Sequence, residues 1–178
     1  MSGVSRKGMI QVYTGNGKGK TTAALGQAFR AAGHGLKTIM IQFMKGSRDC
    51  GEIRASELLR PYLTIEPMGR NCLIDRQHPE PVDFEYAQKA LGLARKHLTG
   101  KEYDIVILDE VNVAIDYGLI DLQSVLDLID RRPDDVELII TGRYAPQEII
   151  DRADLVTEMV ERKHYYQRGV KERVGIER

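Results

Sequence analysis

The stretch TGNGKGKT at residues 14–21, which is Thr14-Gly15-Asn16-Gly17-Lys18-Gly19-Lys20-Thr21, decides the fold of this chain. An apolar segment rich in strand-forming residues precedes it, and a segment with helical periodicity follows it. Three glycines within five positions allow backbone N–H groups to turn toward one point, with no Cβ in the way. The N-terminus of the following helix adds a partial positive charge. The stretch therefore predicts a loop that binds the phosphate groups of a nucleotide.

The side chains of this loop have distinct predicted roles. Lys20 is expected to reach phosphate oxygens as a point charge, and the hydroxyl of Thr21 to coordinate Mg²⁺. General phosphate-binding loops follow G-x-x-x-x-G-K-[ST], whereas this chain has Thr14 in place of the first glycine and a further cation at Lys18. The predicted nucleotide-binding residues of the loop are Thr14, Gly15, Asn16, Gly17, Lys18, Gly19, Lys20, Thr21 and Thr22.

Strand-like and helical segments alternate along the rest of the chain, which predicts an α/β fold with a mainly parallel central sheet of about six strands flanked by helices. The expected strands are Ile10–Tyr13, Thr38–Phe43, Leu63–Pro67, Ile105–Leu108, Glu137–Ile140 and Leu155–Met159. The expected helices are Lys20–Ala32, Glu52–Leu59, Asp83–Leu98, Leu122–Asp130 and Pro146–Asp151. Gly33 and Gly35 suit the end of the first helix, and Asp83 is expected to cap the start of the third.

Two irregular segments, residues 44–51 and 68–82, follow the second and third strands. The second contains Gly69, Pro79 and Pro81 and has little periodicity. Ligands bind outside the carboxyl ends of strands in open α/β sheets, so both loops are expected at the site.

A pair of acidic residues ends the fourth expected strand, where Asp109 and Glu110 follow an apolar run. In P-loop proteins such a strand delivers a carboxylate to the Mg²⁺ beside the loop threonine. The sequence leaves open which carboxylate contacts the metal. It also leaves open whether Glu110 binds Mg²⁺, binds a ribose hydroxyl or activates water.

Further polar residues lie at the carboxyl ends of other strands. Arg143 is a candidate for contacts with phosphate or a ligand carboxylate, and its alternative is a surface arginine paired with an acid. Gln42 and Lys45 are candidates for the nucleotide site on the same grounds, with the same alternative. Lys163 and His164 are a weaker signal near the C-terminus.

Composition narrows the classes of function. At 178 residues the chain is expected to form a single nucleotide-binding domain, with a short N-terminal arm at residues 1–8 and a C-terminal tail at 161–178. Lys and Arg total 26 and Asp and Glu total 26, so no basic field favours nucleic acid or an anionic membrane. No apolar run is long enough to span a bilayer. Cys50 and Cys72 have no partner motif and are expected to be reduced thiols of a cytoplasmic protein.

Several motifs in order resemble one family, the ATP:corrinoid adenosyltransferases of the bacterial CobA type, whose shorter members are called cob(I)yrinic acid a,c-diamide adenosyltransferases. The resemblance runs from about Gly8 to Glu177. It rests on TGNGKGKTT at 14–22, IQFMKG at 41–46, Gly51-Glu52, VILDE at 106–110, LIITGR at 138–143, ADLVTEM at 153–159 and Lys163-His164.

This resemblance implies a RecA-like P-loop fold and transfer of the 5′-deoxyadenosyl group of ATP to Co(I) of a reduced corrinoid, with inorganic triphosphate as the second product. It implies that Lys20 and Lys18 grip the triphosphate and that Thr21 and Glu110 hold Mg²⁺, so that Lys20, Lys18 and Glu110 are the catalytic residues. It also implies a homodimer and a flavin-type reductant or reductase as partner.

The chain departs from longer members of the family in the loop after the third strand. Those members carry a Phe and a Trp there, whereas the segment Gly69–Ile74 has no aromatic residue. Leu73 and Ile74 are expected either to form an apolar wall against the corrin ring or to be ordinary packing. The departure favours a corrinoid precursor without a nucleotide loop over complete cobalamin.

Two other functions remain open at the sequence level. A RecA-like ATPase would use Glu110 to activate water and would release ADP and orthophosphate. A nucleotide-gated corrinoid carrier would bind both ligands without forming a Co–C bond.

Overall fold

A six-stranded parallel sheet forms the centre of the computed structural model, which describes residues 7–177. The strand order is β3-β2-β4-β5-β1-β6, and all five neighbouring pairs are parallel, so the predicted α/β fold is confirmed. The strands are β1 Ile10–Thr14, β2 Thr38–Phe43, β3 Leu63–Met68, β4 Ile105–Asp109, β5 Glu137–Thr141 and β6 Leu155–Glu158. The helices are α1 Lys20–Ala32, α2 Gly51–Leu58, α3 Pro81–Thr99, α4 Val111–Asp116, α5 Leu122–Asp130, α6 Gln147–Ile150 and the 3₁₀ turn η1 Tyr165–Arg168.

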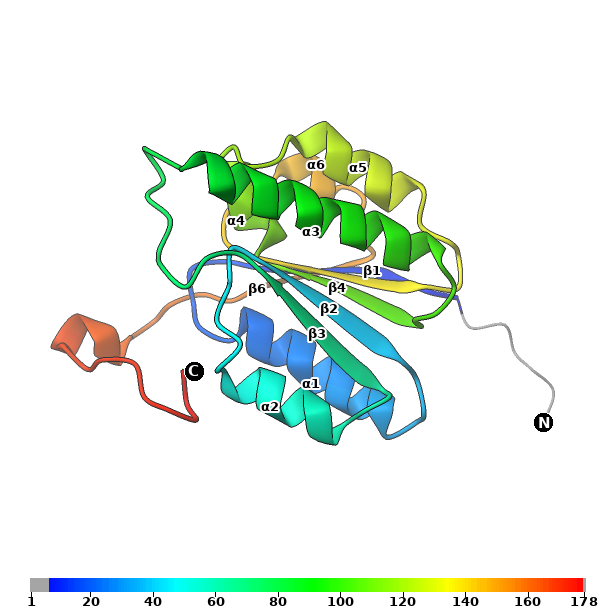
Figure 1. Cartoon of the computed structure of the whole chain (residues 1–178), viewed down its shortest axis with the longest axis horizontal. Coiled ribbons are helices and arrows are strands. Elements are labelled where there is room, and N and C mark those ends of the chain that lie inside the picture. The colour runs from blue at the N-terminus through cyan, green and yellow to red at the C-terminus, as the bar shows by residue number, and fades with distance from the viewer. Residues whose placement is uncertain (1–6, 178) are drawn as a thin grey trace.

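Helices cover both faces of the sheet. In Figure 1, α1 and α2 lie below the sheet, and α3, α4, α5 and α6 lie above it. The central strands are apolar on both faces, as a doubly covered parallel sheet requires. Successive residues of β2 serve the two layers in turn, since Ile41 packs in the cluster of the upper face and Met40 in that of the lower face.

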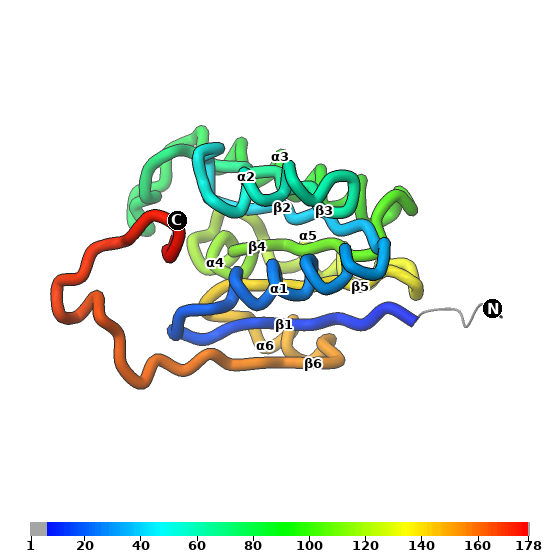
Figure 2. Tube along the Cα trace, turned by 90° about the horizontal axis from the view of Figure 1, so that it is seen from below, coloured from blue at the N-terminus to red at the C-terminus, as the bar shows by residue number. Residues whose placement is uncertain are grey.

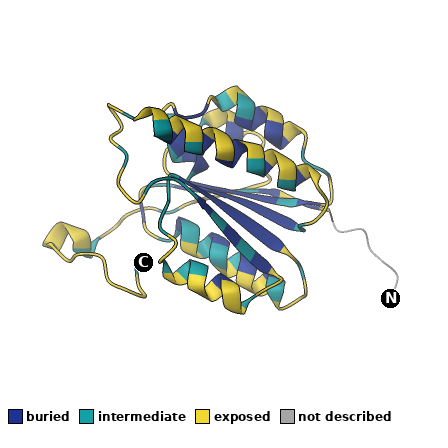
Figure 3. Cartoon of the chain, in the orientation of Figure 1, coloured by how far each residue is buried: buried dark blue, intermediate teal, exposed yellow. Residues whose placement is uncertain are grey.

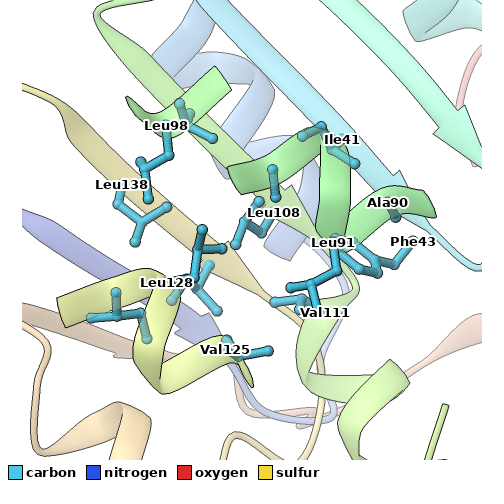
Figure 4. Close-up of a cluster of buried hydrophobic side chains, with 14 of the residues drawn as sticks. Ile41, Phe43, Ala90, Leu91, Leu98, Leu108, Val111, Val125, Leu128 and Leu138 are labelled. Atoms are coloured by element: carbon cyan, nitrogen blue, oxygen red, sulfur yellow. The ribbon is translucent and has the colours of Figure 1, made fainter. Parts of the chain in front are cut away.

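The larger core lies under α3, α4 and α5 (Figure 4). Leu108 and Leu138 of the sheet contribute to the same cluster as Leu91 and Leu98 of α3 and Leu128 of α5. The smaller core lies under α1, where alanines spaced four and three residues apart face the sheet (Ala24, Ala28 and Ala31). The small alanine side chains bring α1 close to the sheet, and α1 begins at Lys20, at the end of the phosphate loop.

The predicted elements agree with the structure to within one or two residues at most ends. The six-residue helix α4 was not predicted, because it is too short to show a helical period of its own. The prediction that Asp83 caps the start of α3 was wrong. Glu80 is the N-cap residue, and Asp83 lies three positions into the helix. Asp83 still acts at this helix start, because its Oδ2 accepts a hydrogen bond of 2.9 Å from the backbone N–H of Glu80. Gly33 ends α1 as predicted.

The two edges of the sheet differ in burial, as Figure 3 shows. All residues of the edge strand β6 are exposed, whereas the other edge strand, β3, alternates between buried and partly buried residues. The predicted arm at residues 1–8 lies largely outside the described residues, and only Lys7 and Gly8 are described. No helix within residues 7–177 combines the length and the apolar character needed to cross a membrane.

The connections leave a crevice at the carboxyl ends of the strands. The loops after β1 and β2 lead to helices below the sheet, and those after β4 and β5 lead to helices above it (Figure 1). Ligands of open α/β sheets bind where neighbouring strands send their connections to opposite faces. This occurs between β2 and β4 and between β5 and β1, so the crevice has the phosphate loop on one side and Glu110 on the other.

Candidate nucleotide-binding and active site

A cavity of about 750 Å³ opens at the carboxyl ends of the strands. The phosphate loop forms its floor from Asn16 to Thr22, and Lys45, Glu110 and Arg143 approach from the ends of β2, β4 and β5. The C-terminal tail curls back from β6 (Figure 2), so that Gly175, Ile176 and Glu177 line the same cavity. A volume of this size suits a ligand as large as a nucleotide together with part of a second substrate.

The glycines of the loop allow the segment after β6 to approach closely. The backbone N–H of Gly17 donates a hydrogen bond of 2.6 Å to the carbonyl of Met159, just after β6. A Cβ at Gly15 or Gly17 would lie 2.5 or 2.7 Å from that carbonyl oxygen. Gly15 and Gly19 also have positive φ angles of 91° and 124°, which side chains rarely adopt.

The unusual first residue of the loop has a structural role. The Oγ1 of Thr14 accepts a hydrogen bond of 3.3 Å from the backbone N–H of Ala145, in the loop between β5 and α6. A glycine at this position would lose that contact. Thr14 is buried and does not line the cavity, so it supports the loop from below.

Lys20 lies at the centre of the loop and is only 7% exposed. Its Nζ donates hydrogen bonds of 2.7 and 2.8 Å to the carbonyl oxygens of Gly15 and Gly17. Burial lowers the pKa of Lys20 below its ordinary value, while nearby Glu110 opposes that effect. The ammonium group is thus held at the point toward which the loop turns.

Asp109 is fully buried and is the centre of a hydrogen-bond network. Its Oδ1 accepts from the hydroxyls of Thr21 and Thr141 at 2.8 and 2.7 Å. Its Oδ2 accepts from Nζ of Lys45 at 2.7 Å and from Gln42 at 3.3 Å. Burial by itself would raise the pKa of Asp109, but the Lys45 ammonium and these hydroxyl donors hold it below its ordinary value. Asp109 is therefore an anion that already has protein donors on both oxygens.

Glu110 has a different environment. It adopts a left-handed conformation with φ of 63° at the start of α4, and its backbone N–H donates a hydrogen bond of 3.0 Å to Oγ1 of Thr141. The side chain lines the cavity. Burial, and then the charge of Asp109, raise the pKa of Glu110 above its ordinary value. Glu110 is therefore the carboxylate better placed to meet a cation in the cavity.

The oxygen donors around Thr21 fit a Mg²⁺ ion. Mg²⁺ prefers oxygen ligands and is usually held by one or two carboxylates together with substrate phosphates. Within the described part of the chain, no group of three or more His, Cys, Asp or Glu could hold a metal alone. The hydroxyl of Thr21 and the carboxylate of Glu110 would thus form an incomplete set that a triphosphate completes.

The other predicted residues differ in how close they lie to the cavity. Lys18, Thr22 and Arg143 line the cavity. Lys45 lines it as well and lies beside Thr21. Gln42 is buried beneath the site, next to Asp109. Lys18 is exposed, and its Nζ donates a 3.2 Å hydrogen bond to the carbonyl of Ile176 in the tail. His164 lines the cavity, and its Nδ1 caps η1.

The structure also adds residues that the sequence did not single out as ligand contacts. Arg76, Val113, Tyr117 and Tyr144 also line the cavity. They come from three separate segments, so no local pattern could have grouped them. The two apolar candidates of the loop after β3 separate, because Ile74 packs against the core and Leu73 is 99% exposed.

Comparison with known proteins identifies the family of this chain. A family model described as ATP:corrinoid adenosyltransferase BtuR/CobO/CobP matches residues 6–178. The chain belongs to the ATP:corrinoid adenosyltransferase family. It is 38% identical to a corrinoid adenosyltransferase of Escherichia coli K12 over 96% of this chain and 86% of that protein. It is 37% identical to the corrinoid adenosyltransferase CobA of Salmonella typhimurium, with the same two shares covered.

Solved structures support the fold of this corrinoid adenosyltransferase family member at lower identity. The KaiC-like protein PH0186 of Pyrococcus horikoshii superposes with a TM-score of 0.58 at 16% identity, over 85% of this chain and 72% of that one. The flagellar accessory protein FlaH of Methanocaldococcus jannaschii gives 0.56 at 13% identity, over 88% and 73% of the two chains. Such likeness confirms a P-loop type of architecture and concerns the fold alone.

Proposed function

We propose that this chain transfers the 5′-deoxyadenosyl group of ATP to Co(I) of a reduced corrinoid and releases inorganic triphosphate. The electron pair of Co(I) forms the Co–C5′ bond, the C5′–O bond breaks, and its electrons leave with the triphosphate, so the cobalt becomes formally Co(III). The observation that carries the proposal is a phosphate loop with two lysines, Lys18 and Lys20, facing the same cavity as Glu110, in a chain of this family.

The loop residues are assigned to the leaving group. Lys20 is buried at the focus of the loop, where its charge and the loop N–H groups oppose negative charge that develops on the triphosphate. Lys18 adds a second cation once its side chain leaves the carbonyl of Ile176. Because Co(I) is itself the nucleophile, no protein base is required, and the protein contributes alignment and charge stabilisation.

The metal role is assigned to Thr21 and Glu110, with Asp109 as the positioning residue for Thr21. Mg²⁺ held there would neutralise charge on the phosphate oxygens. The hydrogen bond from Thr21 to Asp109 fixes the rotamer of the hydroxyl side chain. Gln42 and Lys45 in turn hold Asp109. We place Gln42 behind the nucleotide, whereas Lys45 also lines the cavity and can meet a phosphate there.

The preferred substrate is proposed to be a corrinoid precursor such as cob(I)yrinic acid a,c-diamide, with cob(I)alamin as the other candidate. The segment 69–74 offers no aromatic side chain, and Leu73 is the apolar side chain that it leaves exposed. Cob(I) forms exist only under reducing conditions, so a flavin-type reductant or reductase is the expected partner.

The proposal extends to the location and the assembly of the enzyme. We propose a cytoplasmic homodimer in which residues 1–178 act as one nucleotide-binding domain. The tail from residue 161 closes on the cavity of its own chain, because Gly175, Ile176 and Glu177 lie on the cavity wall.

One reaction mixture tests the proposal. Protein, MgATP and chemically reduced cobyrinic acid a,c-diamide are combined without oxygen, and the spectrum of the adenosylcorrinoid is followed together with the phosphate products. Triphosphate and a light-sensitive Co–C bond are expected in equal amounts. ADP and orthophosphate without alkylated corrinoid would indicate the ATPase, and binding of both ligands without products would indicate the carrier.

A further inference from the structure

A second group of polar and aromatic side chains lines the same cavity and comes from segments other than the phosphate loop. Arg76 comes from the loop between β3 and α3, Tyr117 from the end of α4, and Tyr144 from the loop after β5. The guanidinium carbon of Arg76 lies 5.8 Å from the centroids of both tyrosine rings. A guanidinium between two aromatic faces is held in place by cation–π attraction.

An acid fixes this arginine further. One Nη2 donor of Arg76 makes an ion pair of 2.8 Å with Oδ1 of Asp116. The other oxygen, Oδ2, is buried without a hydrogen-bond partner among the described residues. Asp116 uses one guanidinium nitrogen, and the Arg76 side chain remains 56% exposed. The remaining donors are available to a ligand.

The distance from the triphosphate end decides what this group can bind. Glu110, Val113 and Tyr117 are spaced three and four residues apart, so they lie along one face of α4. Glu110 directly precedes the six-residue helix α4 and Tyr117 directly follows it, so about 10 Å along the helix axis separates them. Lys18, Lys20 and Arg143 line the same cavity, and the proposed function assigns the anionic end of the nucleotide to the loop lysines. A cation this far along the wall points to an anion on the other substrate.

The backbone conformation of Tyr144 supports a role for this residue in ligand binding. This residue has a φ of 60°, in the left-handed region that is uncommon for residues with side chains. Its side chain is 53% exposed, although it is a large aromatic group. Strained backbone persists where the surrounding structure holds it and often marks ligand contacts.

We infer that Arg76, held between Tyr117 and Tyr144, recognises a free carboxylate at the edge of the corrin ring and selects corrinoids that carry such carboxylates. The inference rests on the proposed function and names the substrate class for it. The guanidinium binds the carboxylate through charge-assisted hydrogen bonds, and the tyrosine rings cover the apolar rim of the macrocycle. A fully amidated corrinoid gains no such ion pair.

The test compares two substrates that both lack the nucleotide loop. Cob(I)yrinic acid a,c-diamide has free peripheral carboxylates, and cob(I)inamide has amides in their place. In Arg76→Gln the ratio of kcat/KM for the first over the second should fall about 10–100-fold, as expected for loss of a charged hydrogen bond. Arg76→Lys should fall between this variant and the wild type, because it keeps the charge and loses the planar fork.

Controls separate this role from others. Arg131→Gln, an exposed arginine after α5, should leave the ratio unchanged. Tyr144→Phe should keep it, and Tyr144→Ala should lower it because one wall of the guanidinium is lost. An unchanged ratio in Arg76→Gln, an equal loss with both corrinoids, or a raised KM for ATP would overturn the inference.

A binding measurement distinguishes failure of the inference from failure of the proposed function. The cob(II) forms of both corrinoids are titrated against wild type and Arg76→Gln in the presence of MgATP, where no adenosyl transfer is needed. Tighter binding of the carboxylate form that depends on Arg76 supports the inference even if no product is ever formed. Equal binding of the two forms by the wild type contradicts it.

Discussion

Adjacent residues in this site have opposite electrostatic settings. Asp109 is an ionised, fully buried acceptor whose oxygens are occupied by Thr21, Thr141 and Lys45. Glu110, the next residue, faces the cavity with a raised pKa. Asp109 is the last residue of the buried strand β4, whereas Glu110 follows the strand in a left-handed conformation and lines the cavity. At the residue scale, one carboxylate is therefore structural and the other is free to meet a ligand.

Loss of either Lys20 or Thr21 should remove activity without unfolding the protein. Lys20→Ala and Thr21→Ala should each lower kcat/KM by about 100-fold or more, since each removes a group aimed at the triphosphate or its metal. Adenosylcorrinoid formation measures the activity, and circular dichroism measures the fold. The matched control is Lys37→Ala, because Lys37 is an exposed lysine just before β2, at the end of the strands opposite the cavity. Normal turnover in either site variant would refute the assigned roles.

Glu110→Gln should be inactive and yet more stable than the wild type at neutral pH. The pKa of Glu110 is raised mainly by burial, so the folded chain holds its proton more tightly than the unfolded chain. Below the ordinary carboxyl pKa both states are protonated, and the folded state keeps its full stability. As the pH rises through the higher pKa of the folded state, the buried carboxyl must ionise, and that stability is lost. The amide avoids that loss, so the variant should be more stable than the wild type at pH 7.5.

Urea unfolding with EDTA and without nucleotide measures this gain. At about pH 4, near the ordinary carboxyl pKa, the two proteins should differ less. The exposed Glu102→Gln is the control. A variant that is less stable than the wild type at pH 7.5 would show that attraction to Lys45 and Lys20 outweighs burial.

At the scale of elements, the phosphate loop depends on a strand more than 130 residues later in the chain. Strand β6 pairs with β1 in parallel, and the chain just beyond it, at Met159, accepts the hydrogen bond from Gly17. An exposed edge strand thereby supports the loop from one side. The glycines at positions 15 and 17 are needed for this approach, and they belong to the loop that we propose to bind phosphate.

Two glycine substitutions separate these effects. In Gly17→Ala the new Cβ would meet the carbonyl of Met159 at 2.7 Å, so the loop or β6 must shift. We expect a loss of about 1–3 kcal/mol of stability and weaker ATP binding. In Gly26→Ala, within α1, the Cβ would meet nothing within 4 Å, and stability should rise by about 0.5–1 kcal/mol. Denaturant unfolding and ATP titration measure both, and equal behaviour of the two variants would contradict this role of β6.

At the scale of the whole molecule, the site is a product of topology. The strand order brings the ends of β2, β4, β5 and β1 side by side, although they come from positions 43, 109, 141 and 14 of the chain. The C-terminal tail then returns to the same cavity and contacts Lys18. A ligand in the cavity therefore touches segments from nearly the whole chain and should stabilise all of it.

Nucleotide and inorganic triphosphate should both raise the melting temperature. At about 100 times the dissociation constant, a ligand adds about 2.7 kcal/mol of stability, or roughly 5–10 °C for a chain of this size. Differential scanning fluorimetry with MgATP and with magnesium triphosphate measures the shift. Lys20→Ala should abolish it for both ligands. Stabilisation by ATP but not by triphosphate would show that the adenosine end, and not the loop, provides the affinity.

The sequence by itself determined the strand, loop and helix around residues 14–21, the alternation of strands and helices, and the acidic end of β4. These features depend on backbone freedom and on short-range periodicity, which neighbouring residues express directly. Only the tertiary structure decided that Asp109 is enclosed while Glu110 faces the cavity, that Gly17 packs on Met159, and that Arg76 lies between two tyrosines. Each of those outcomes depends on contacts between distant segments and on burial, which the folded sheet creates.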